Sequence, residues 1–142
     1  MMPSVELGML ADSIPRDRRW RILVCGGRYN RDYQQMDEAL DQLWSMCHHR
    51  MALIEGGHPT GTDLWALQWA QKHMLELELH HMVAAPGDMQ DTRLRAQALW
   101  AVQPDAFLHF PGPNPLANEL HGMAFDHRVP VWRAPERLEA KR

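Results

Sequence analysis

The sequence is short of cysteine and of excess charge, and each shortage excludes a class of protein. Its two cysteines, Cys25 and Cys47, lack CxxC spacing and are too few for a disulfide framework, so we expect reduced thiols. The formal net charge is −3, which disfavours nucleic acid as a partner because nucleic-acid-binding domains usually carry a basic surface.

Long apolar runs are also missing. None approaches the roughly 18 residues that a membrane span requires, so we expect no association with a membrane. The N-terminus has no basic segment followed by an apolar one, as a secretory signal would, and we therefore expect a cytoplasmic protein. At 142 residues the chain fits one domain.

Several familiar site motifs are absent from the sequence. No GxGxxG follows a predicted strand, which argues against an ordinary dinucleotide dehydrogenase. Gly56 and Gly61 have the glycine spacing of a P-loop, but Thr62 and Asp63 stand where that motif needs Lys and Ser or Thr. The nine histidines show no zinc spacing such as HExxH, so we interpret them as scattered surface residues. We expect neither a metal nor a cofactor.

The hydrophobic pattern alternates between short apolar runs and helical periods. The apolar runs predict strands at residues 21–25, 51–54, 78–85, 105–110 and 129–132. Apolar residues that recur every three or four positions predict helices within residues 36–47, 64–74, 90–101 and 116–127. This order predicts an α/β domain of three layers, with helices on both faces of a mostly parallel five-stranded sheet. We expect an N-terminal extension over 1–19, the domain over 20–134 and a C-terminal tail over 135–142.

Three unusual loops follow the first, second and fourth predicted strands. In open parallel sheets the ligand binds outside the carboxyl ends of the strands, so these loops are the expected binding edge. The residues that we expect to bind the ligand there are Gly26, Gly27, Arg28, Tyr29, Glu55, Gly56, Gly57, Thr60, Gly61, Asp63, Pro111, Gly112 and Asn114.

The second loop is rich in glycine and precedes a predicted helix. Its glycines permit positive φ and close approach of a ligand, and the helix N-terminus offers free N–H groups to an anion such as phosphate. The alternative is a simple turn in which Thr60 and Asp63 form a capping box, and both interpretations can hold together. Because Asp63 would repel a phosphate beside it, a ribose hydroxyl is its more natural partner.

Four other side chains have a functional and a structural interpretation. Arg28 suits a bidentate phosphate contact but is equally compatible with a solvated loop. Tyr29 could stack on a base or simply pack. Trp65 and Trp69 lie one turn apart on a predicted helix, where they mark a hydrophobic face or the seam of a dimer. We expect a homodimer or a higher homo-oligomer.

Four segments carry a family resemblance. They are Ile22 to Arg28 (ILVCGGR), Ile54 to Asp63 (IEGGHPTGTD), Pro104 to Gly112 (PDAFLHFPG) and Val129 to Val131 (VPV). In this order and spacing the chain resembles the YspA-type, YpsA-related branch of the SLOG superfamily, which includes the Smf/DprA and LOG proteins. The resemblance implies a Rossmann-like fold and a nucleotide or nucleotide-derived small molecule as the ligand.

The third of these segments departs from the LOG pattern PGGxGTxxE. The chain reads PGPNPLANE over residues 111–119, and proline offers no N–H to a phosphate. The resemblance implies a ligand-binding arginine at Arg93 or Arg95, of which we place Arg95 at the site. It also implies that Glu119 stands at the position of the catalytic acid of LOG-type phosphoribohydrolases, although an early-helix glutamate also favours the helix dipole.

Two functions from different classes follow from these observations. The first is a binding module or sensor that captures a nucleotide or a nucleotide-derived small molecule. The second is a nucleoside monophosphate phosphoribohydrolase, an N-glycosidase in which Glu119 assists. The damaged third loop favours binding over catalysis. Single-stranded DNA binding, as in the DprA relatives, is disfavoured by the acidic balance.

Overall fold

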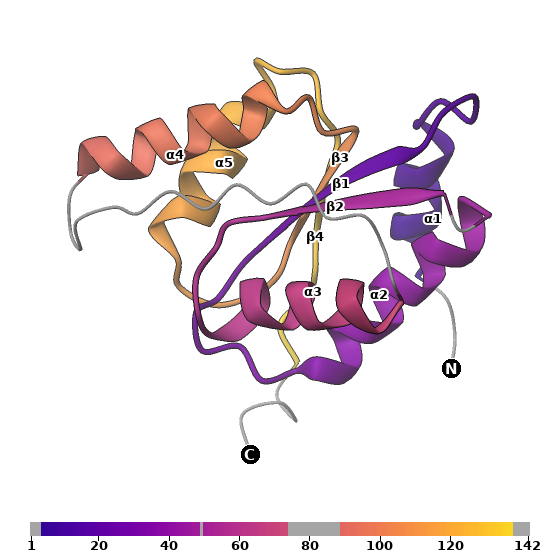
Figure 1. The fold of residues 1–142 in the computed structure, drawn as a ribbon, viewed down its shortest axis with the longest axis horizontal. Helices are drawn as coiled ribbons and strands as arrows, with labels where there is room; N and C mark the ends of the chain where they lie inside the picture. The colour runs from indigo at the N-terminus through magenta and orange to yellow at the C-terminus, as the bar shows by residue number, and fades with distance from the viewer. Residues whose placement is uncertain (1–3, 49, 74–88, 138–142) are drawn as a thin grey trace.

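The computed structural model describes residues 4–48, 50–73 and 89–137 and contains a parallel sheet (Figure 1). The strands are β1 (Trp20–Cys25), β2 (Met51–Glu55), β3 (Ala106–His109) and β4 (Val131–Arg133). Their spatial order is β2-β1-β3-β4, and every pairing is parallel. The α/β fold with a parallel sheet is confirmed. The expectation of five strands is corrected, because the sheet has four strands among the described residues; the segment 78–85, where we expected the other strand, lies outside those residues.

The central strands are buried on both faces. Ile22, Leu23 and Val24 of β1 have no exposed surface, and Phe107 and Leu108 of β3 have none either. Strands covered by helices on both sides need continuous apolar runs rather than alternation, which is why the short runs predicted these strands.

Each face of the sheet has its own hydrophobic core, which packs against its own set of helices (Figure 1). One core packs beneath α1 (Val5–Asp12), α2 (Tyr33–Met46) and α3 (Gly61–Lys72). The other packs beneath α4 (Met89–Ala101) and α5 (Pro115–Ala124). Helix α1 was not predicted. It begins at the N-cap Ser4, whose hydroxyl accepts the Leu7 N–H, and it packs on α2 and β4.

The paired tryptophans belong to the first core. Trp65 is 6% exposed and Trp69 is 3% exposed. Their indole N–H groups donate to Oδ1 of Asp37 at 2.7 Å and of Asp41 at 3.0 Å, which ties α3 to α2. The hydrophobic-face interpretation is confirmed, and the dimer-seam interpretation of these two side chains is wrong.

The strand order creates a switch point between β1 and β3. The chain leaves β1 toward α2 on one face of the sheet and leaves β3 toward α5 on the other (Figure 1). Loops that part in this way leave a crevice at the carboxyl ends of the strands, where open α/β sheets bind their ligands. Within the described ranges, no helix is long and apolar enough to cross a membrane.

Candidate functional site

The first and third loops of the binding edge touch each other through their backbones. The Gly27 N–H donates to the Pro111 carbonyl at 3.1 Å. A Cβ on Gly26 would lie 2.6 Å from the Phe110 carbonyl oxygen, and one on Gly27 would lie 2.4 Å from the Pro111 oxygen. No side chain fits at such distances, so both glycines are required by the loops themselves.

The second loop packs onto the first in the same manner. Gly61 has φ +67°, and a Cβ there would lie 2.4 Å from the Arg28 backbone. The backbone N–H and the hydroxyl of Thr62 both donate to the Gly27 carbonyl at 3.1 Å. The Thr60 hydroxyl donates to the Arg28 carbonyl at 2.7 Å. The three loops therefore pack together at one edge of the sheet. At Gly61 the group that comes close to the glycine is the Arg28 backbone, where we had expected a ligand.

The capping-box hypothesis for the second loop is wrong. Thr60 is the N-cap residue of α3, but its side chain makes no capping hydrogen bond. The loop N–H groups instead meet the chain's own carboxylates. Gly57 donates to Oε2 of Glu55 at 2.6 Å, and His58 donates to Oδ2 of Asp63 at 3.1 Å. An anion at this loop would find those two donors already engaged.

Asp63 is a buried carboxyl group in the first turn of α3. It is 1% exposed, and its Oδ1 has no hydrogen-bond partner among the described residues. Burial raises the pKa of Asp63 to about 7, and the Glu55 carboxylate adds to the rise, while the His58 N–H opposes it. Near neutral pH this side chain can therefore either donate or accept a hydrogen bond.

Two arginines from separate elements converge on the second loop. Arg28 is half-buried, has no carboxylate partner within the described residues, and has a buried Nε without a partner. Arg95 on α4 donates from Nη2 to the Gly56 carbonyl at 2.7 Å. The pKa of His58 is lowered by burial and by the charges of both arginines, which places all three groups in one electrostatic neighbourhood.

A pocket of about 470 Å³ lies at the switch point between the first and third loops. Its lining comes from residues 29–32, from residues 111–113, and from Glu136 and Arg137 after β4. Tyr29 stands at its rim with 79% of its surface exposed. Of the expected ligand residues, the pocket gathers Tyr29, Pro111 and Gly112, whereas Arg28, Thr60, Gly61 and Asp63 lie on the side of the first loop that faces β2.

A larger cavity, of about 940 Å³, lies between α1, α2 and β4. Its charged lining residues are three acids, Glu6, Glu38 and Asp41, and two arginines, Arg133 and Arg137, so it carries no excess of positive charge for an anionic ligand. It also lies away from the loops that follow β1, β2 and β3. The smaller pocket is therefore the better candidate for the ligand site.

Comparison with known proteins identifies the family of the chain. The sequence model of the YspA, cpYpsA-related SLOG family (YAcAr) matches residues 20–90, which is half of the chain. The chain belongs to this family. The match includes β1, β2 and the loops that follow both strands. No curated protein matches the chain.

The third loop of this SLOG protein lies beyond the family match and offers few donors. Asn114 is 2% exposed and caps α5, where its carboxamide accepts the Leu116 N–H at 3.0 Å and donates to the Gly26 carbonyl at 2.8 Å. Pro111, Pro113 and Pro115 have no N–H group. A phosphate at the start of α5 would therefore find little to bind.

The structure separates the two candidate arginines of α4. The Arg93 side chain is 73% exposed, and its Nε lies 3.7 Å from Oε1 of Glu119 on α5. Arg95 is the arginine that reaches the second loop. Glu119 does not line the switch-point pocket, and among the described residues it pairs with Arg93.

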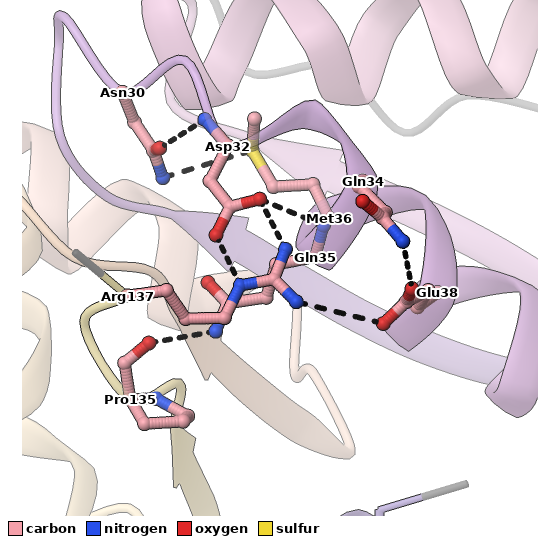
Figure 2. Close-up of polar contacts among 8 residues, drawn as sticks. All are labelled: Asn30, Asp32, Gln34, Gln35, Met36, Glu38, Pro135 and Arg137. Carbon is pink, nitrogen blue, oxygen red and sulfur yellow. Dashed lines mark hydrogen bonds and ion pairs between the residues drawn. The ribbon is translucent and has the colours of Figure 1, made fainter. Parts of the chain in front are cut away.

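Sequence analysis missed an ion pair at the wall of the pocket (Figure 2). The N-cap residue of α2, Asp32, accepts from Nε of Arg137 at 2.5 Å and also from Nη2 of the same guanidinium. Its backbone N–H donates to Oδ1 of Asn30 at 2.9 Å. The only local signal is an Asp just before a helical period, because the partner arginine lies 105 residues away in the expected tail.

We expected all the histidines to lie on the surface, and this expectation is wrong for His109. His109 of β3 is 4% exposed, and its Nδ1 lies 2.7 Å from Nδ1 of His121 on α5. Within residues 4–48, 50–73 and 89–137, no three side chains of His, Cys, Asp or Glu come together as a metal site would require. His80 and His81 lie outside the described residues.

Proposed function

We propose that the protein binds a nucleotide or a nucleotide-derived small molecule at the carboxyl edge of a Rossmann-like three-layer domain, and that it acts as a binding module or sensor. Membership of the SLOG family supports a ligand of this class. The observation that carries the proposal is the guanidinium of Arg28, which is half-buried on the side of the first loop that faces β2 and lacks a carboxylate partner among the described residues.

A half-buried cation is costly unless an anion compensates it, and guanidinium geometry suits a phosphate. Arg95 would add a second cation close to the same loop, although one of its nitrogens is engaged by Gly56. We therefore place the phosphate on these two arginines rather than at the N-terminus of α5, where prolines replace the donors.

The switch-point pocket suits the rest of such a ligand. The pocket volume of about 470 Å³ falls in the range of small-molecule sites.

The alternative is a LOG-type N-glycosidase with Glu119 as its acid. The missing donors of the third loop argue against it, because poor positioning of the phosphate costs rate steeply. The carboxylate of Glu119 is also directed to Arg93 rather than to the pocket.

The test is the identity of the bound molecule. The full chain would be purified natively and then denatured, and the released small molecules would be examined by mass spectrometry. We expect a phosphorylated nucleoside derivative, and we expect AMP to bind the ligand-free protein in calorimetry. Failure of both experiments would overturn the proposal.

A further inference from the structure

We infer that Glu136 and Arg137, which follow β4, form the third wall of the switch-point pocket, and that the Asp32–Arg137 ion pair holds this wall in place. The pocket closed in this way takes the flat, uncharged base of the ligand. The inference rests on the proposed function and adds to it which part of the site receives which part of the ligand.

The segment after β4 is fastened at successive points (Figure 2). The Ala134 N–H donates to the His109 carbonyl at 3.0 Å, which extends the pairing of β4 with β3. The Gln35 side-chain amide donates to the Pro135 carbonyl at 2.7 Å. Arg137 then makes its two-pronged contact with Asp32, and its Nη1 lies 3.9 Å from Oε2 of Glu38.

The ion pair is partly shielded from water, so it is weakened less by solvent than a surface ion pair would be. The side chain of Asp32 is 10% exposed, and that of Arg137 is 33% exposed. Contact with Arg137 lowers the pKa of Asp32, so the carboxylate stays charged at neutral pH. Removal of Arg137 takes the guanidinium away from the Asp32 carboxylate, and removal of Asp32 takes the two-pronged contact away from Arg137, so the position of the segment depends on both.

Arg137 separates two cavities. It lines the switch-point pocket together with Asp32, and it lines the larger cavity together with Gln35 and Glu38. Displacement of residues 135–137 would therefore open the small pocket toward the large cavity and remove one of its sides. Arg137 is a positioning residue, because it acts through the wall that it holds.

The chemistry of the pocket favours a base over a phosphate. Its charged lining residues balance, with Arg31 and Arg137 against Asp32 and Glu136. Pro111 and Pro113 bring no N–H groups, and the exposed ring of Tyr29 offers a stacking surface at the rim. The cation without a carboxylate partner among the described residues, Arg28, is on the other side of the first loop, which leaves the phosphate outside this pocket.

Three probes separate the two ends of the ligand. AMP carries both ends, adenosine lacks the phosphate, and ribose 5-phosphate lacks the base. Calorimetry on Arg137→Ala should show that the affinities for AMP and adenosine fall by about tenfold or more, whereas that for ribose 5-phosphate stays within about twofold. Arg137→Lys should recover part of the loss, because it keeps the charge without the bidentate geometry.

A pair of truncations provides a matched control. A chain that ends at Arg137 should bind AMP as the full chain does, and a chain that ends at Ala134 should behave like Arg137→Ala. Circular dichroism and thermal unfolding would establish that each variant is folded. Equal losses for all three probes, or an unchanged affinity for AMP in Arg137→Ala, would overturn the inference alone. Failure of the full chain to bind any of the probes would overturn the proposed function, and the inference with it.

Discussion

The Nδ1 atoms of His109 and His121 face each other at 2.7 Å beneath α5. One ring must donate to the other across this distance, so the pair cannot carry protons on both Nδ1 atoms. Burial, together with the charges of His121 and Arg133, lowers the pKa of His109 to about 4. His109 is therefore neutral at neutral pH.

His109 should make the protein more stable as the pH rises from about 4 to 6.5. In this window His109 is protonated in the unfolded chain but not in the folded protein. The lower pH values of the window therefore favour unfolding. The shift corresponds to roughly 3 kcal/mol at most. Denaturant unfolding of wild type and His109→Gln at several pH values should show that the difference in free energy changes across this window. Parallel curves would contradict the prediction.

Asp63 should act with the opposite sign. Its pKa is about 7 in the folded protein and near 3.8 in the unfolded chain, so the folded state binds more protons between these values and loses stability as the pH rises. Asp63→Asn should therefore gain stability relative to wild type toward pH 7, by roughly 4 kcal/mol at most. Asp126→Asn, which removes a carboxylate at an exposed position, is the matched control for the change in charge. The two opposing effects should flatten the wild-type profile.

Arg28→Ala should weaken the binding of AMP by roughly 1.5–3 kcal/mol, which is the scale of a charge-assisted hydrogen bond. The affinity for adenosine should change little, because adenosine has no phosphate. Arg16→Ala removes an arginine whose side chain is 59% exposed and which pairs only with Asp12 among the described residues, so it controls for net charge. Calorimetry on the folded variants decides the matter, and equal losses for AMP and adenosine would refute the assignment.

The glycines should divide into two classes by stability. Gly61→Ala adds a Cβ 2.4 Å from the Arg28 backbone at a positive φ, and we expect a loss of roughly 2 kcal/mol or more. Gly122→Ala lies within α5 and meets no atom within 4 Å, so helix propensity should raise stability by about 0.5–1 kcal/mol. Thermal unfolding would compare the two, and equal shifts would show that the interlocked loops do not constrain Gly61.

The wild-type protein should release no free base from common nucleoside monophosphates. Glu119→Gln should change AMP affinity only modestly, because Glu119 does not line the pocket. Chromatography after prolonged incubation is the measurement. Base release by wild type that disappears in Glu119→Gln would promote the phosphoribohydrolase instead.

The sequence predicted the parts of the fold that rest on local pattern. Apolar runs ending in glycine marked β1 and β2, and the same glycines marked the loops of the binding edge. Helix α1 was not predicted because it is only eight residues long and contains Gly8 near its centre. A segment this short shows too few repeats of the helical period to recognise.

Features that depend on tertiary contact could not be predicted in this way. The Asp32–Arg137 pair joins residues far apart in the chain, and no local pattern links them. His109 looks like any other histidine until β3 and α5 bring it against His121. Trp65 and Trp69 fit a core or a seam equally well until Asp37 and Asp41 of α2 satisfy their indoles.

The backbone contact between Gly27 and residues 111–112 has a mechanical consequence. A Cβ on Gly112 would lie 2.8 Å from the Gly27 Cα, so neither loop can shift toward the other. The first loop leads into α2 on one face of the sheet, and the third leads into α5 on the other. A molecule bound between the two loops would therefore contact segments that lead into helices on opposite faces of the sheet.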